Sequence, residues 1–149
     1  IVGLEGINHT LEKLGTEGVE LRRGVEDEHA FEEGVNNRVT ARGLVSVLRL
    51  IEDEQAISRE ASDRMLEILH QQEFRGGIPA GLPDDARVAN KTGEISTATH
   101  DAGLVYLPGR KPYALAILTE WDASRTSGRR ETLAKISRAV YRQLTEAEA

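Results

Sequence analysis

The sequence predicts an α+β fold, in which helices pack against a three-stranded antiparallel meander and a further helix closes the chain. Two observations predict it. Apolar residues recur at helical spacing in the first half of the chain and again at its C-terminal end. Between these regions lie three strand-like runs, and the sequence PGRKP between the last two is typical of a hairpin turn. Residues 1–85 are therefore expected to be helical with one long loop, and residues 86–149 to form the sheet and the closing helix.

The first helix is expected at residues 4–14, where leucine and isoleucine recur on one face and Gly15 follows. Residues 16–39 then lose all periodicity, are acidic and contain three glycines. This pattern predicts a long structured loop with about one turn of helix. Loops of this length inside a compact domain are uncommon unless they serve a function.

Two more helices are expected before the sheet. Thr40 and Ser58 are suited to act as N-caps, because their hydroxyls can accept a hydrogen bond from the first helical turn. Each is followed by an apolar stripe at helical spacing. The glycines and prolines of RGGIPAGLP then predict a turn-rich connector.

Strands are expected at Arg87–Ile95, 102–107 and 113–121, and the final helix at 128–144. The outer edge of the first strand has no partner in this scheme. Unpaired strand edges are usually covered or paired in proteins, so the sheet predicted from this chain is incomplete at this edge.

The composition limits the classes of function. The 149 residues suffice for one domain with a hydrophobic core, and 39% are hydrophobic and 30% charged, as in ordinary globular proteins. A formal net charge of −6 and short, separated basic pairs argue against a nucleic-acid partner. The absence of cysteine excludes disulfides and zinc–thiolate sites, and no apolar run reaches membrane-span length.

The tripeptide Lys91-Thr92-Gly93 is the strongest candidate for chemistry. An ammonium and a hydroxyl at the edge of a sheet can hold a carboxylate, the first by charge and the second by a hydrogen bond. Glycine lets a ligand approach the strand closely because it has no side chain. The backbone N–H of Glu94 could then stabilise a developing oxyanion. An exposed strand end without function would have the same sequence.

Other signatures are missing. The four histidines lie far apart and form no HExxH motif, so no metal site is expected. No glycine-rich phosphate or dinucleotide loop is present. His100 and Asp101 are adjacent on a predicted strand and should point to opposite faces, which argues against an acid–base pair.

The order of these segments resembles the penicillin-recognising serine hydrolases, above all the class A β-lactamase-like group. The resemblance covers nearly the whole chain. It includes the Lys-Thr-Gly strand, the connector GIPAGLP, the next two strands in THDAGLVYLPGRKPYALAILT, and the paired helices in ARGLVSVLRLIEDEQAISREASDRMLEILHQQ. It implies that the chain forms part of a three-layer fold of the β-lactamase and transpeptidase type.

The resemblance also implies an activity. Members of this group cleave an amide or ester through an acyl-enzyme, with a Ser-x-x-Lys nucleophile and a Ser-Asp-Asn loop. Neither motif occurs here. The family places both upstream, so residues 1–149 are expected to be the C-terminal portion of one such domain, inactive alone and completed by an N-terminal half or a second chain. No cofactor is implied, the substrate would be a β-lactam or D-alanyl peptide with a carboxylate, and an extracytoplasmic location is expected.

The resemblance assigns the long loop to the family's Ω-like loop, whose glutamate activates the deacylating water. Glu26 and Glu32 are the two candidates for this base. The other candidate catalytic residues are Lys91 and Glu94. The candidate substrate-binding residues are Lys91, Thr92 and Gly93. A solvated acidic loop without a catalytic role is the alternative for the two glutamates. The alternative for the whole chain is a non-catalytic carboxylate-binding or interaction module on the same scaffold.

Overall fold

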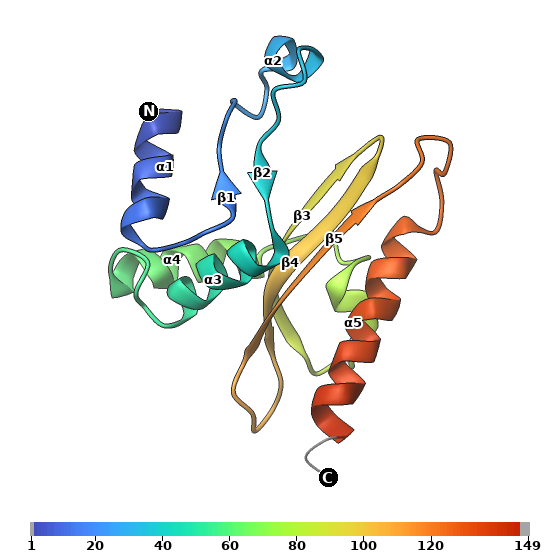
Figure 1. The fold of residues 1–149 in the computed structure, drawn as a ribbon. Helices are drawn as coiled ribbons and strands as arrows, with labels where there is room; N and C mark the ends of the chain where they lie inside the picture. The colour runs from blue at the N-terminus through green and yellow to red at the C-terminus, as the bar shows by residue number, and fades with distance from the viewer. Residues whose placement is uncertain (1, 147–149) are drawn as a thin grey trace.

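The computed structural model describes residues 2–146 and confirms the α+β class (Figure 1). Its main sheet contains β3 (Arg87–Ile95), β4 (Ala98–Tyr106) and β5 (Tyr113–Glu120), all antiparallel and in the order β3-β4-β5. The central strand, β4, is therefore paired on both sides. Within residues 2–146, β3 and β5 each pair with one strand only, so one edge of each is open.

The predicted bounds of β3 are confirmed, whereas the prediction of 102–107 for the next strand is wrong at its start. β4 begins at Ala98, and a two-residue turn connects it directly to Ile95. The polar residues Thr99 and Asp101 occupy buried positions in this first part of β4. They hide the alternation of apolar and polar residues by which a strand is recognised from sequence.

The helices begin where their caps were predicted. The Thr40 hydroxyl accepts a hydrogen bond from the Gly43 N–H (3.0 Å), and the Ser58 hydroxyl accepts one from the Ala61 N–H (3.1 Å). The helices are α1 (Leu4–Lys13), α3 (Ala41–Glu52), α4 (Arg59–His70) and α5 (Arg129–Glu146).

Residues 16–39 are more ordered than a loop with one helical turn. The turn is α2 (Glu28–Glu32), capped by the Asp27 carboxylate. In addition β1 (Val19–Glu20) and β2 (Arg38–Val39) pair as a short antiparallel ribbon that closes the loop at its base. Each strand has two residues, too few for any periodic pattern to show in the sequence.

The sheet separates two apolar cores and thus forms the middle of three layers. On one face, α3 and α4 pack against Ala89, Ala102 and Leu104. On the other face, α5 and the 3₁₀-helix η1 (Ile78–Gly81) pack on Val88 and Val105 (Figure 1). Odd-numbered residues of β3 therefore face α3 and α4, and even-numbered residues face α5.

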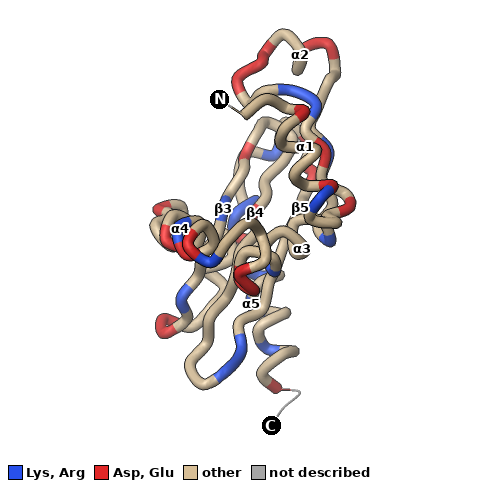
Figure 2. Tube along the Cα trace, turned by 90° about the vertical axis from the view of Figure 1, so that its left-hand side faces the viewer, with Lys and Arg blue, Asp and Glu red and all other residues tan. Residues whose placement is uncertain are grey.

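The charges are spread over separate elements, as Figure 2 shows, and no continuous basic band runs along the described chain. No helix within residues 2–146 is long and apolar enough to span a membrane. The described residues also contain no group of three or more His, Asp or Glu side chains placed to hold a metal ion.

Candidate functional site

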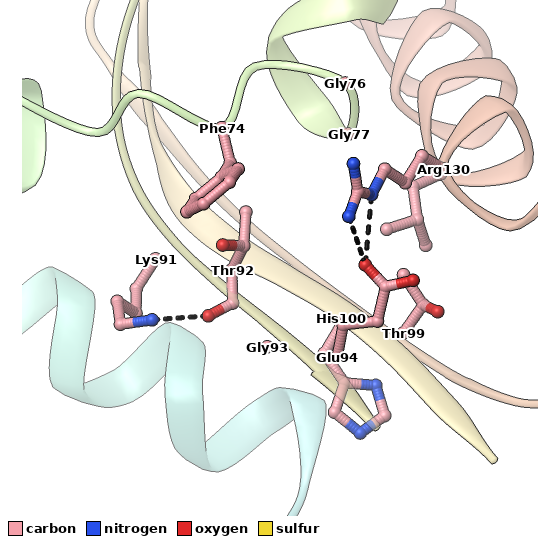
Figure 3. A pocket seen from close by; sticks show the side chains of 11 residues that line it. Phe74, Gly76, Gly77, Lys91, Thr92, Gly93, Glu94, Thr99, His100 and Arg130 are labelled. Carbon is pink, nitrogen blue, oxygen red and sulfur yellow. Dashed lines mark hydrogen bonds and ion pairs between the residues drawn. The ribbon is translucent and has the colours of Figure 1, made fainter. Parts of the chain in front are cut away.

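A cleft of about 310 Å³ lies along β3, between the connector that leads into η1 and the first turn of α5 (Figure 3). Residues 91–94, which the sequence singled out, all line it. The connector contributes an aromatic ring and two glycines, β4 two residues, and α5 an arginine and a leucine. The lining residues are Phe74, Gly76, Gly77, Lys91, Thr92, Gly93, Glu94, Thr99, His100, Arg130 and Leu133.

Lys91 and Thr92 reach this cleft from different directions, because successive side chains of a strand leave on opposite faces. Thr92 lies on the α5 face of β3, and Lys91 on the face toward α3 and α4. The exposed Lys91 side chain bends back, and its Nζ donates a hydrogen bond to the backbone carbonyl of Thr92 (2.5 Å; Figure 3). The ammonium therefore lies beside the backbone of residue 92, at the strand.

Gly93 is not required by the packing of this chain. A Cβ atom built on Gly93 would meet no atom of the described residues within 4 Å, and the residue is exposed. The backbone at residue 93 is thus open to approach, as the sequence argument expected of a glycine beside a ligand.

The side chain of Glu94 makes an ion pair that no pattern in the sequence predicts. Its Oε2 accepts hydrogen bonds from Nε (3.0 Å) and Nη2 (2.5 Å) of Arg130, in the first turn of α5 (Figure 3). The Glu94 side chain is 42% exposed and that of Arg130 is 56% exposed. The pair crosses the cleft from sheet to helix and joins residues 36 positions apart in the chain.

A buried carboxylate fixes the connector to the sheet beneath the cleft. Asp101 is fully buried, and its two oxygens accept hydrogen bonds from the Ile78 N–H (2.8 Å) and from Nδ2 of Asn90 (2.9 Å). Burial raises the pKa of Asp101 above its ordinary value, although both hydrogen bonds act to lower it. Gly77 packs so closely on this carboxylate that a Cβ there would lie 3.2 Å from the Asp101 Cγ.

Two residues of β4 complete the lining. Thr99 is opposite Glu94 in the strand register and is 2% exposed, and its hydroxyl has no hydrogen-bond partner among the described residues. His100 accepts a hydrogen bond at Nδ1 from the Thr119 N–H (3.1 Å), so the neutral ring carries its proton on Nε2. His100 is paired with Gly93 and Asp101 with Thr92, on opposite faces, which confirms that His100 and Asp101 do not form an acid–base pair.

Glu26 and Glu32, the two candidate bases, are exposed residues of the segment around α2 and do not line this cleft. Both assignments stay predictions. Conversely, the sequence argument missed Phe74, Thr99 and Arg130 as lining residues. A correct prediction of where β4 begins would have placed Thr99 opposite Glu94 in the sheet. No sequence pattern could have placed Arg130 in this cleft, because its position depends on the packing of α5 beside the sheet.

Comparisons with known proteins agree with the fold. A model of the beta-lactamase enzyme family matches residues 1–144. A β-lactamase of Bacillus licheniformis is 27% identical over 147 residues, which are 97% of this chain and 48% of the relative. A β-lactamase of Bacteroides uniformis is 28% identical over 149 residues, 93% of this chain and 50% of the relative. The chain thus spans about half the length of the curated relatives it matches.

Solved structures show the same arrangement of elements. The structure of PBP-A superposes with a TM-score of 0.84 and 26% identity, over 97% of this chain and 52% of PBP-A. That of the TLA-1 extended-spectrum β-lactamase superposes with a TM-score of 0.87 and 24% identity, over 95% of this chain and 55% of TLA-1. These likenesses support the three-layer fold that the sequence predicted.

Proposed function

This chain belongs to the beta-lactamase enzyme family, and from this premise we propose that it forms the carboxylate-recognition side of a serine hydrolase active site. The observation that carries the proposal is the cleft along β3, because all four residues that the sequence singled out line it. Residues 1–149 would then form the C-terminal portion of one β-lactamase-like domain, with the long loop in 1–85 and the sheet and α5 in 86–149.

In this proposal Lys91 and Thr92 bind the carboxylate of the substrate, by charge and by a hydrogen bond respectively. Gly93 keeps the strand approachable, in agreement with the open space around it. The backbone N–H of Glu94 stabilises the oxyanion that forms when a nucleophile attacks the amide or ester carbonyl. Such a donor is available on an open strand edge, where alternate backbone groups point away from the neighbouring strand.

The nucleophile would come from polypeptide outside these 149 residues, since no serine here is followed by lysine three positions later. A β-lactam or a D-alanyl peptide would be the substrate, attacked at its amide to form an acyl-enzyme. A solved structure of a relative fits this chemistry, because a mutant of PBP-A forms an acyl-enzyme complex with penicillin G. Glu26 or Glu32 would activate the water that hydrolyses the acyl-enzyme. Export of the whole protein stays a prediction.

The surface of the chain suggests where the missing polypeptide would pack. Helix α1 buries none of its residues, although Ile7, Leu11 and the following Leu14 form a half-buried apolar stripe. The open edges of β3 and β5 are further candidate contacts. We propose that an N-terminal half or a second chain covers these surfaces.

The test is covalent labelling with a fluorescent penicillin. A protein that joins this chain to upstream sequence with Ser-x-x-Lys should form an acid-stable adduct, and its Thr92→Val variant should form it more slowly. The 149-residue chain alone should form none. A labelled band from the chain alone would contradict the location of the nucleophile, and a longer protein that never labels would favour the non-catalytic module.

A further inference from the structure

We propose that Phe74 is a specificity-determining residue of the cleft, whose ring contacts the apolar group carried by the carbon next to the substrate carboxylate. The cleft then favours acids in which this apolar group is branched or part of a ring over acids that end in D-alanine. This inference rests on the proposed function, because it concerns the same substrate, and it names the residue that chooses between the two substrate classes proposed there.

Phe74 is an exposed aromatic residue that the packing of this chain does not require. It is 63% exposed, and among the described residues it belongs to neither of the two apolar cores that flank the sheet. Single exposed apolar residues are common in proteins, so exposure alone indicates no function. The position of Phe74 is the informative feature, because the residue lines the cleft that contains residues 91–94.

The connector presents this ring on a fixed wall of the cleft. The two other connector residues that line the cleft, Gly76 and Gly77, have no side chain, so the ring is the only side chain that this wall offers. The Phe74 N–H donates to Oε1 of Gln72 (3.0 Å), and the Ile78 N–H ties the connector to the sheet (2.8 Å). A phenylalanine has few side-chain torsions, so ordering its ring against a ligand costs little conformational entropy.

The ring lies beside the position proposed for the substrate carboxylate. Figure 3 shows it extending from the connector toward Thr92, whose hydroxyl we propose as a donor to that carboxylate. The next carbon of the substrate is one bond from the carboxylate, so the group that it carries has to lie against a wall of the cleft near Thr92. The wall formed by Glu94 and Arg130 is an ion pair, which an apolar group would desolvate at a cost. The Phe74 wall is therefore the favourable side for an apolar group.

The two proposed substrate classes differ in this apolar group. In a D-alanyl peptide it is a single methyl group. In penicillin the corresponding carbon belongs to the thiazolidine ring, and the neighbouring ring carbon carries two methyl groups. Each methyl group that becomes fully buried can strengthen binding up to about four-fold. A contact with the exposed Phe74 ring buries a ligand group only in part, so we expect a smaller gain for each methyl group.

The experiment is an NMR titration of the ¹⁵N-labelled 149-residue chain with two acids, N-acetyl-D-alanyl-D-alanine and N-acetyl-D-alanyl-D-valine. They differ only in the group next to the carboxylate, which is methyl in the first and isopropyl in the second. The C-terminal amides of both dipeptides are the matched probes that lack the carboxylate. The variant is Phe74→Ala. The control is Phe31→Ala, because Phe31 is also exposed (44%) but stacks with Arg23 (5.0 Å) and does not line the cleft.

We expect the wild-type chain to bind the D-valine acid about two- to five-fold more tightly than the D-alanine acid. Phe74→Ala should abolish this preference, mainly by weakening binding of the D-valine acid, whereas Phe31→Ala should keep it. Equal affinities of the wild type for the two acids would overturn the inference. A preference that survives Phe74→Ala would also overturn it, and the ring would then be free to contact polypeptide outside this chain.

The outcomes separate this inference from the proposed function. If both acids bind more tightly than their amides, with shifts at residues 91–93, but the wild type does not prefer the D-valine acid, carboxylate recognition stands and the role of Phe74 is wrong. If neither acid is distinguished from its amide, the proposed function is wrong, and the role of Phe74 with it.

Discussion

Replacement of Asp101 by alanine should both destabilise the chain and loosen the wall of the cleft. The two oxygens of this buried carboxylate are the acceptors for the Ile78 N–H and the Asn90 amide. A buried donor left without an acceptor costs about 1–3 kcal/mol. Loss of both acceptors should therefore lower the free energy of unfolding by about 2–6 kcal/mol, a large part of the ~5–15 kcal/mol that stabilises a typical domain.

Asp101→Asn is the matched control. The asparagine oxygen can still accept the bond from Ile78, while its amide group would face the amide of Asn90. The Oδ1 of Asn90 is buried and has no hydrogen-bond partner within residues 2–146. Rotation of the Asn90 amide would turn this oxygen toward the new donor, so we expect the cost to be about 1 kcal/mol or less.

Urea unfolding followed by the fluorescence of Trp121 measures both variants, with the NMR signals of Gly76 and Gly77 as the report on the cleft wall. The alanine variant should shift these glycine signals and the asparagine variant should leave them close to wild type. If alanine and asparagine have equal effects, or if alanine costs under about 0.5 kcal/mol, the carboxylate does not fix the connector as we describe.

The remaining predictions concern pH, packing and capping. Because burial raises the pKa of Asp101, the folded state binds more protons than the unfolded state. The free energy of unfolding of the wild type, relative to Asp101→Asn, should thus fall as pH rises from the ordinary aspartate pKa through the raised one; a rise would show that the pKa is lowered instead. Gly77→Ala should lower the free energy of unfolding by about 1–3 kcal/mol, because its Cβ would crowd the Asp101 side chain, and an unchanged urea midpoint would refute this packing. Thr40→Ala should lower the free energy of unfolding by about 1 kcal/mol, because the α3 cap is lost. Thermal unfolding followed by circular dichroism measures this loss, and a variant as stable as wild type would show that the cap is unimportant. Tyr106→Phe should lower the free energy of unfolding by about 1–2 kcal/mol, because the Tyr106 hydroxyl donates to the Glu52 carboxylate. An equal loss in a Glu52→Ala background, which has no acceptor, would argue against that bond.

Much of the fold could be predicted from the sequence because its signals are local. The hydroxyls of Thr40 and Ser58 cap helices by accepting hydrogen bonds from backbone N–H groups three residues away. The strand-like pattern of residues 87–95 likewise predicts both ends of β3. The start of β4 could not be predicted in this way. Its buried residues Thr99 and Asp101 are polar, so they break the apolar–polar alternation by which a strand is recognised from sequence.

The candidate site divides in the same way. The tripeptide at 91–93 was visible because its residue types suit carboxylate binding and follow one another in the chain. The contact of Glu94 with Arg130 depends on the packing of α5 beside the sheet, which no local pattern encodes. In the proposed function, the positions of Glu26 and Glu32 relative to a reacting group would depend likewise on the polypeptide proposed to complete the cleft.

The most direct test of carboxylate recognition by β3 is the affinity of the Thr92→Val chain for N-acetyl-D-alanyl-D-alanine, compared with Thr10→Val on the exposed surface of α1. Valine keeps the shape of threonine and removes the hydroxyl. We predict that Thr92→Val weakens binding of N-acetyl-D-alanyl-D-alanine about two- to ten-fold, as expected for one hydrogen bond. The affinity of Thr92→Val for the C-terminal amide of this dipeptide should equal that of the wild type. Thr10→Val should bind the acid as tightly as the wild type does. Equal affinities of Thr92→Val and wild type for the acid would contradict carboxylate binding at this strand.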